Sequence, residues 1–265
     1  GFILPDLENP SYARIAKQLE QGARARGYQL LIASSDDAPD SERQLLKLFR
    51  ARRCDALFVA SCLPPEDDSY RQLQDLGLPI IAIDRTLEPA RFCSVISDDC
   101  EASLQLTRSL LKPVPQQIAL IGARPELSIS QARAAGFKQA LEGFGGEILI
   151  EHGAAFSREC GRRIIDELLE RLGHFPEALV TTSYVLLQGM FDALQEHPDQ
   201  KPPLRLATFG DTQLLDFLPL PVNAMGQQHQ LIAEKALELA LAAIEERRYE
   251  PGIRAIARTF KQRIQ

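Results

Sequence analysis

The sequence predicts an α/β protein of two doubly wound lobes, each with a parallel sheet between layers of helices. Short apolar runs such as "IIAI" (80–83) alternate with amphipathic helical stretches along the chain. Strands that alternate with helices favour parallel pairing through right-handed crossovers. The alternation restarts after Asp98, which indicates a second series and therefore a second lobe. The chain has 265 residues, enough for two lobes of roughly 100–150 residues each.

The first series contains four strand-like runs and three helical stretches. Strands are expected in "FIL", "QLLIAS", "ALFVAS" and "PIIAID", because each is a short apolar run. Helices are expected in "PSYARIAKQLEQGARARGY", "SERQLLKLFRARR" and "YRQLQDLG", where apolar residues recur at helical spacing. Asn9 is a good N-cap for the first helix, and Pro10 suits its first position. This half of the chain therefore predicts a complete strand–helix lobe.

The second series begins with a helix in "CEASLQLTRSLL" and ends with a long helix in "QHQLIAEKALELALAAIEERR". Strands are expected in "QIALIG", "EILIEHG", "EALVTT", "RLATFG" and "PVNAMG". Further helices are expected in "SQARAAGFKQALEGFG", "CGRRIIDELLERL" and "VLLQGMFDALQEH", the first of them capped by Ser128 or Ser130. The Pro- and acid-rich stretches "CLPPEDDSY" and "HPDQKPPL" are interpreted as surface loops.

Composition narrows the function classes. The chain is 45% hydrophobic with a net charge of −6, so it is a poor electrostatic partner for nucleic acid or an anionic membrane. Its five cysteines are odd in number and scattered, which fits reduced thiols in a cytoplasmic protein. No run is apolar enough for long enough to span a bilayer, and no secretory signal is visible.

Common catalytic and cofactor motifs are missing from the sequence. No GxGxxG follows the first strand, and there is no GxxxxGK[ST], GxSxG or HExxH. The four histidines form no metal-spaced pair, and no nucleophile–base constellation stands out. We therefore expect no catalytic residues, no metal and no cofactor.

Candidate binding residues are sought directly after the strands, because ligands of open parallel sheets lie beyond the carboxyl ends of the strands. Two arginines at such places can fork onto a phosphate, while carboxylates, amides and hydroxyls can bond sugar hydroxyls. Plainer interpretations remain open: a capped helix start for Ser11, a solvated helix position for Arg133 and a core position for Phe156. The residues at these places are Ser11, Asp84, Arg85, Arg133, Phe156, Ser183, Asp211 and Gln227.

Several segments resemble the effector-binding core of LacI/GalR-type bacterial transcriptional regulators. They include "LPDLENPSYARIAKQLEQGARARGYQLLIASSD", "RRCDALFVAS", "PIIAIDR", "VISDD", "QARAAGF" and "GQQHQLIAEKA". The resemblance implies a type I periplasmic-binding-protein-like fold whose lobes, 1–98 plus 228–252 and 99–227 plus 253–265, are joined by three crossovers. It also implies a homodimer, and an N-terminal helix-turn-helix head, absent from this chain, that binds operator DNA.

Within this family, "ELSISQAR", "ALVTTSYVLLQGM" and "LATFGDTQLLDFL" are similar to the fructose-responsive members. That similarity implies fructose 1-phosphate as the effector, with fructose 1,6-bisphosphate as a weaker one, bound in the crevice between the lobes and releasing operator DNA. The eight residues above fall at the family's ligand positions, and Tyr12 lies beside them. Two departures concern the second lobe. Gly210 stands at the family's usual Asp place, and Ser183-Tyr184 replaces the frequent Asn-Asp pair.

Two other functions remain open at this point. An extracytoplasmic sugar-binding protein of an ABC-type transporter shares the implied fold. An enzyme acting on sugar phosphates through an unrecognised site is the second alternative.

Overall fold

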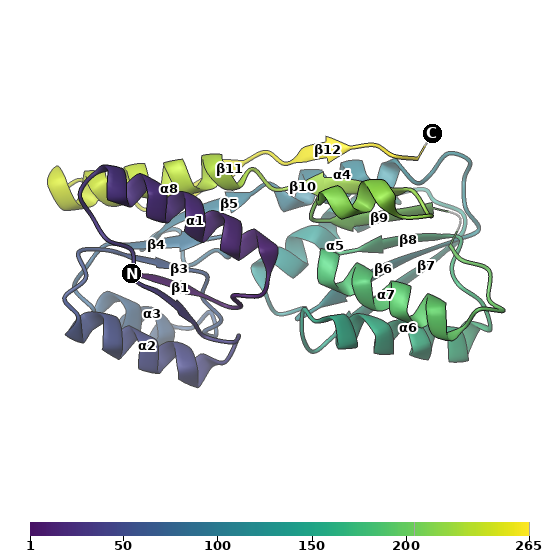
Figure 1. Ribbon diagram of the computed structural model, residues 1–265, viewed down its shortest axis with the longest axis horizontal. Helices are drawn as coiled ribbons and strands as arrows, with labels where there is room; N and C mark the ends of the chain where they lie inside the picture. The colour runs from purple at the N-terminus through teal and green to yellow at the C-terminus, as the bar shows by residue number, and fades with distance from the viewer. Residues whose placement is uncertain (204, 265) are drawn as a thin grey trace. The chain divides into compact units, whose positions relative to one another are not determined.

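The computed structural model describes residues 1–203 and 205–264, which form two compact units. Unit 1 comprises Gly1–Ser97 and Gln228–Ile256, and unit 2 comprises Asp98–Gln227 and the chain from Ala257 onward. The chain therefore passes from one unit to the other three times. Each unit contains its own six-stranded sheet with helices on both faces (Figure 1).

The sheet of unit 1 has the strand order β11-β5-β4-β3-β1-β2, and all its strands are parallel. Two of its four helices begin with a proline. In the first helix, the Asn9 side chain accepts a hydrogen bond from Ser11 N, and proline occupies the first turn. The strands are β1 (Phe2–Leu4), β2 (Ile32–Ser34), β3 (Leu57–Val59), β4 (Ile80–Ile83), β5 (Cys93–Ser97) and β11 (Gly252–Ile256). The helices are α1 (Pro10–Ala25), α2 (Pro39–Ala51), α3 (Asp67–Gln74) and α8 (His229–Glu245).

Alternate residues of these strands feed two separate cores. Phe2, Leu4 and Ile81 pack with α1 and α8 on one face of the sheet. Ile3 and Ala82 pack on the other face in a core that includes residues of α2 and α3. Successive side chains of a strand point to opposite faces, so the continuous apolar runs follow from burial on both sides. Figure 1 shows α1 and α8 together on one side of this sheet and α2 and α3 on the other.

Unit 2 repeats this plan with the strand order β12-β10-β9-β8-β6-β7. Helix α6 packs with α7, and α4 packs with α5. The strands are β6 (Gln117–Ala123), β7 (Glu147–Gly153), β8 (Ala178–Thr181), β9 (Arg205–Phe209), β10 (Val222–Gly226) and β12 (Thr259–Lys261). The helices are α4 (Asp99–Arg108), α5 (Ser128–Ala140), α6 (Arg158–Leu172) and α7 (Tyr184–Glu196), with a 3₁₀ turn η1 (Gln213–Phe217). The prediction of parallel sheets is confirmed except at β12, which pairs antiparallel with β10.

Three expectations from the sequence need correction. Residues 253–256 were assigned to the second lobe, but they belong to β11, which pairs with β5 in unit 1. Asp98, assigned to the first lobe, is the N-cap of α4 in unit 2. Neither Ser128 nor Ser130 caps α5. Leu127 holds the N-cap position, and Ser130 Oγ instead donates to Ala123 O at 2.7 Å.

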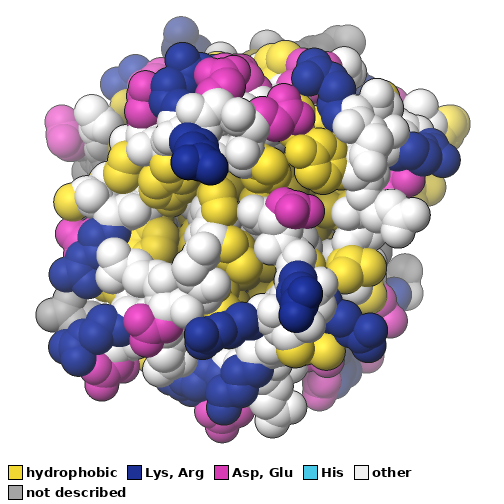
Figure 2. Space-filling model, turned by 90° about the vertical axis from the view of Figure 1, so that its left-hand side faces the viewer, with side chains coloured by type: hydrophobic (Ala, Val, Ile, Leu, Met, Phe, Trp, Pro, Cys, Tyr) yellow, Lys and Arg dark blue, Asp and Glu magenta, His cyan; other side chains and the backbone are white. Residues whose placement is uncertain are grey.

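The surface mixes charges of both signs. On the face seen in Figure 2, dark blue Lys and Arg side chains alternate with magenta Asp and Glu, and apolar side chains lie between them. Within residues 1–203 and 205–264, no helix combines the length and the apolar character that crossing a bilayer demands.

Candidate functional site

In unit 1, the predicted residues gather beyond the carboxyl ends of β1 and β4. Asp84, directly after β4, has a positive φ of 68° and is buried. Its Oδ2 accepts a 2.8 Å hydrogen bond from the hydroxyl of Tyr12, which lies in the first turn of α1. Burial, and then the Asp84 charge, raise the pKa of Tyr12 well above its ordinary value. Beside it, Ser11 Oγ lies 3.3 Å from His229 Nε2 at the start of α8.

Both Nη atoms of Arg85 have hydrogen-bond partners within unit 1. Its Nη1 and Nη2 donate to the two carboxylate oxygens of Asp37 at 2.5 and 3.0 Å, and Nη1 also reaches Ser61 O at 3.3 Å. Burial works to lower the pKa of Arg85, but Tyr12 and Asp37 raise it above the ordinary value. The buried Nε has no hydrogen-bond partner within the described part of the chain. The guanidinium is therefore charged and oriented, with one donor to spare.

A buried glutamate supports the loop on which Arg85 rests. Glu42, in α2, is completely buried, and its two carboxylate oxygens accept from Ser61 Oγ and Cys62 N, each at 2.6 Å. Burial first, and the neighbouring Glu42 second, raise the pKa of the Cys62 thiol to about 12. Glu42 thus fixes the backbone whose carbonyl oxygen meets Arg85.

In unit 2, Arg133 is held beyond the ends of β8 and β9. Its Nε donates to Asp99 Oδ1 at 3.0 Å, and its Nη1 donates to Thr182 O at 2.5 Å. The guanidinium lies over the Phe209 ring, 4.3 Å from the centroid. Arg258 joins this cluster, since its Nε donates to the same Asp99 oxygen at 2.8 Å. The solvated helix position considered for Arg133 is therefore wrong, because the side chain is buried and paired.

The close packing of α4 on α5 sets the position of Arg133. A Cβ added to Gly136 would lie 2.0 Å from Cys100 O, so only glycine permits the two helices to approach this closely. The approach lets Ser103 Oγ donate to the Arg133 carbonyl oxygen at 2.6 Å. The backbone that carries the guanidinium is thereby tied to α4.

Ser183 and Gly210 follow β8 and β9, and each has a role in the backbone that the sequence did not reveal. Ser183 is the N-cap of α7, where its hydroxyl accepts from Leu186 N at 3.4 Å. Gly210 has a φ of +94°, a conformation that favours glycine, and a Cβ there would lie 3.2 Å from Tyr184 Cβ. The positive φ and this close neighbour both favour glycine at position 210, where the family usually has Asp.

The remaining predicted residues lie in different settings. Asp211 Oδ1 accepts from Arg263 Nη2 at 2.6 Å, and a Cβ on Gly226 would lie 3.4 Å from Asp211 Cβ, so Asp211 neighbours the end of β10. Gln227 follows that strand directly. Phe156 is partly buried and packs against the core beneath α6 and α7. Of the unit 2 candidates, Arg133, Ser183, Asp211 and Gln227 thus cluster near the ends of β8, β9 and β10.

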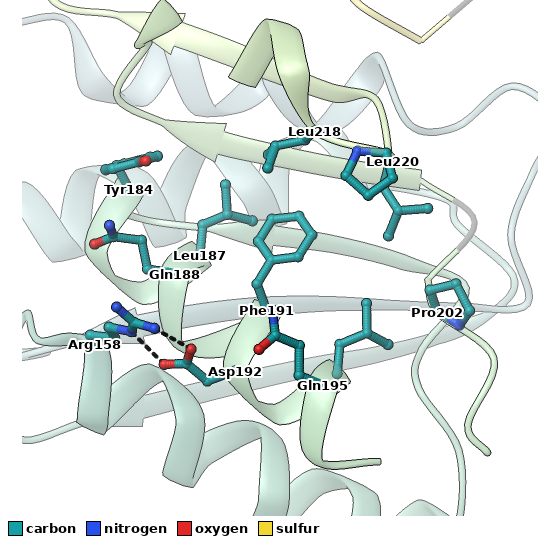
Figure 3. Close-up of a pocket in the computed structure, with 12 residues that line it drawn as sticks. Arg158, Tyr184, Leu187, Gln188, Phe191, Asp192, Gln195, Pro202, Leu218 and Leu220 are labelled. Atoms are coloured by element: carbon teal, nitrogen blue, oxygen red, sulfur yellow. Dashed lines mark hydrogen bonds and ion pairs between the residues drawn. The ribbon is translucent and has the colours of Figure 1, made fainter. Parts of the chain in front are cut away.

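A separate pocket of about 480 Å³ lies along α7 in unit 2. Figure 3 shows Phe191 and Leu187 reaching from α7 toward Leu218 and Leu220, with the Arg158–Asp192 ion pair at one edge. None of the eight predicted residues lines it. No group of three or more potential metal ligands occurs within residues 1–203 and 205–264.

The fold and these strand-end clusters define a sugar-binding domain of the LacI class. A family described as periplasmic binding proteins and sugar binding domain of LacI family matches residues 1–211, so the chain belongs to this family. It is the sugar-sensing domain of a transcriptional regulator and not an enzyme.

Particular relatives narrow the class to regulators of fructose and carbon metabolism. The chain is 48% identical over 263 residues to the fructose operon regulatory protein of Vibrio cholerae, covering 99% of this chain and 80% of the relative. It is 40% identical over 265 residues to the catabolite repressor/activator of Escherichia coli K12, covering 99% and 79%. A crystal structure of the Cra transcriptional dual regulator from Pseudomonas putida, in complex with fructose 1-phosphate, is 75% identical. Its TM-score is 0.97, covering 100% of this chain and 98% of that one.

These comparisons confirm the resemblance inferred from the sequence and favour the regulator over the transporter alternative. The side chains that sequence reasoning missed are the partners of the predicted ones: Asp37 and Glu42 in unit 1, Asp99 and Arg258 in unit 2. Asp37 is 48 positions from its partner Arg85, and Arg258 is 159 positions from its partner Asp99. No local sequence pattern could therefore reveal these pairs.

Proposed function

We propose that the domain binds fructose 1-phosphate through the strand-end residues predicted from the sequence. The observation that carries the proposal is the similarity, at 75% identity over the whole chain, to a regulator crystallised with this compound. The chemistry of the strand ends supports it. Arg85 and Arg133 can hold a phosphate, whereas Ser11, Asp84, Ser183, Asp211 and Gln227 can bond hydroxyls. Phe156 is proposed as an apolar wall for the sugar.

The ion pair of Arg85 sets a condition on its role. Both Nη atoms already bond Asp37, so a phosphate must either replace that carboxylate or accept from the free Nε. Arg133, with Arg258 beside it, is the stronger candidate for the principal phosphate contact. Asp84, oriented by Tyr12, is proposed to accept from a sugar hydroxyl.

The physiological role follows from the family. In the proposal, the effector binds one conformation of the domain better than another and thereby shifts the regulator away from the form that holds operator DNA. By thermodynamic reciprocity, operator DNA then weakens effector binding in the full regulator. Fructose 1,6-bisphosphate is proposed as a weaker ligand. The site of action is the cytoplasm, where sugar phosphates and DNA are both present.

A homodimer is the proposed assembly. The apolar side chains of Phe217 and Leu214 are 83% and 61% exposed on η1, beside the α7 pocket, and such exposure supports association with a second copy. Sedimentation of the purified domain across micromolar concentrations tests this, and a monomer at every concentration would contradict it.

Calorimetric titration with fructose 1-phosphate, fructose 1,6-bisphosphate and fructose tests the effector assignment. We expect the 1-phosphate to bind most tightly and free fructose to bind at least about a hundredfold more weakly, as the loss of a bidentate charged contact implies. Arg133→Ala should remove most of the difference between phosphorylated and free sugar. Equal affinity for all three ligands in the unmodified protein would refute the proposal.

A further inference from the structure

Arg258 occupies the two-residue link between β11 and β12, close to the point where the chain enters unit 2 for the last time. Its side chain is only 3% exposed, and the Asp99 side chain that it meets is 4% exposed. A guanidinium is placed in such a dry setting only at a high desolvation cost, so its contacts must be specific. No local pattern predicts this burial, because the link carries no strand or helix signal in the sequence.

Two guanidinium groups converge on one carboxylate oxygen in this cluster. Arg258 Nε and Arg133 Nε both donate to Asp99 Oδ1, at 2.8 and 3.0 Å. Both groups also lie over the ring of Phe209, at 5.2 and 4.3 Å from its centroid. The two arginines are therefore coupled twice, through the shared oxygen and through the shared aromatic face.

The geometry makes Asp99 the element that orients Arg133. Its carboxylate fixes Nε, Thr182 O fixes Nη1, and the ring fixes the plane of the guanidinium. Asp99 in turn is held by Arg258, which donates to the same oxygen. Without Arg258, the carboxylate loses a charged donor and can turn about its side-chain torsions, taking Arg133 with it.

We propose that Arg258 is a positioning residue of the effector site, which orients Arg133 through Asp99 and so sets affinity for the phosphate of the ligand. This inference rests on the proposed function, because it concerns the same ligand. The inference goes beyond the proposed function because it assigns a role to Arg258, which is not among the predicted site residues. Because the two arginines share one carboxylate in a connected network, we expect loss of Arg258 to lower affinity about tenfold.

The test compares Arg258→Gln, Arg258→Lys and Arg133→Gln in the full domain by calorimetric titration with fructose 1-phosphate. Gln removes the charge and replaces the charged Nε donor by a neutral amide donor, and we expect about a tenfold loss of affinity. Lys keeps a cation that can still reach Asp99, so it should restore part of that loss. Arg254→Gln is the matched control, because Arg254 lies on β11 in unit 1, donates to Ile253 O at 3.4 Å and lies 3.9 Å from Glu250, and so contacts none of the residues of the Asp99 cluster through these bonds. It should bind like the unmodified protein.

A double-mutant cycle separates positioning from a merely structural role. If Arg258 acts through Arg133, the double variant should lose much less affinity than the product of the two single losses. Thermal unfolding of each variant establishes that it is folded at the titration temperature, and the Lys variant serves where Gln does not fold. Binding by Arg258→Gln within twofold of the unmodified protein, or losses that simply multiply, would overturn the inference. Failure of the unmodified protein to bind would instead overturn the proposed function.

Discussion

Replacement of Asp99 by Asn tests the energetic importance of the buried arginine cluster. The substitution keeps the size and one acceptor of the side chain but removes the negative charge that two buried guanidinium groups share. Arg133 and Arg258 would then lie side by side over Phe209 without their common carboxylate. We expect unit 2 to lose much of its stability, because breaking a buried ion pair leaves the remaining charges in a dry environment.

The size of the effect follows from the contacts. A hydrogen bond between charged groups contributes about 1.5–3 kcal/mol, so the two bonds to Asp99 amount to about 3–6 kcal/mol. Asn retains an acceptor oxygen, which recovers part of this, while the opposed guanidinium charges add to the loss. An overall decrease of about 4 kcal/mol in the free energy of unfolding is expected, within the range measured for broken buried pairs.

Urea unfolding followed by circular dichroism measures this quantity, with Asp98→Asn as the matched control. Asp98 is exposed and caps α4 by accepting from Glu101 N at 3.2 Å, and Asn caps a helix equally well. The control should therefore shift the free energy of unfolding by less than about 0.5 kcal/mol. With a denaturant slope of about 2 kcal/mol per molar urea, Asp99→Asn should lower the midpoint by about 2 M. Equal midpoints for the two variants would refute the reasoning and remove the basis for Arg258 as a positioning residue.

Two further substitutions test local features of the units. Gly136→Ala should lower the melting temperature strongly, because the added Cβ would meet a backbone carbonyl oxygen of α4 at 2.0 Å. Gly145→Ala is the control and should be tolerated, because a Cβ there has open space around it. Similar melting temperatures for the two variants would contradict the close approach of α4 and α5. Tyr12→Phe tests the buried bond to Asp84. The pKa of Tyr12 is raised in the folded protein, so its contribution is complete below about pH 10 and is lost as the pH rises through the folded value. The variant should therefore lose less stability than the unmodified protein between about pH 10 and 11, and identical alkaline profiles would count against the assignment.

Most of the fold could be predicted because burial on both faces of a sheet leaves a plain signature in the sequence. The run "IIAI" is completely apolar, and the structure buries every residue of β4. Strands β11 and β12 escaped prediction because their residues are exposed or half-buried and include two charged side chains, Arg254 and Lys261. Their conformation is imposed by pairing with β5 and β10, and no local preference in the sequence carries that information.

The candidate site was predictable in position but not in its interactions. The rule that ligands lie beyond strand ends directed attention to Asp84 and Arg85, and the structure places both residues directly after β4, as the sequence predicts. The rule could not predict that Arg85 forms an ion pair with Asp37, because Asp37 comes from a turn in which residues 36 and 37 both have positive φ. Residues 48 positions apart meet only once the sheet has formed. The interpretation of Arg85 as an arginine available to a phosphate is therefore incomplete.

The contrast between the two arginines bears on how the domain could distinguish a sugar phosphate from a free sugar. In unit 1, one guanidinium faces the Asp37 carboxylate, with the Asp84 carboxylate next to it in the chain. In unit 2, two guanidinium groups face the single carboxylate of Asp99. A phosphate is drawn to the place where donors outnumber carboxylates, and a hydroxyl is best received where oriented carboxylates accept. On these grounds the Asp99 cluster of unit 2 is suited to an anionic group, and the oriented Asp84 carboxylate of unit 1 is suited to a hydroxyl donor.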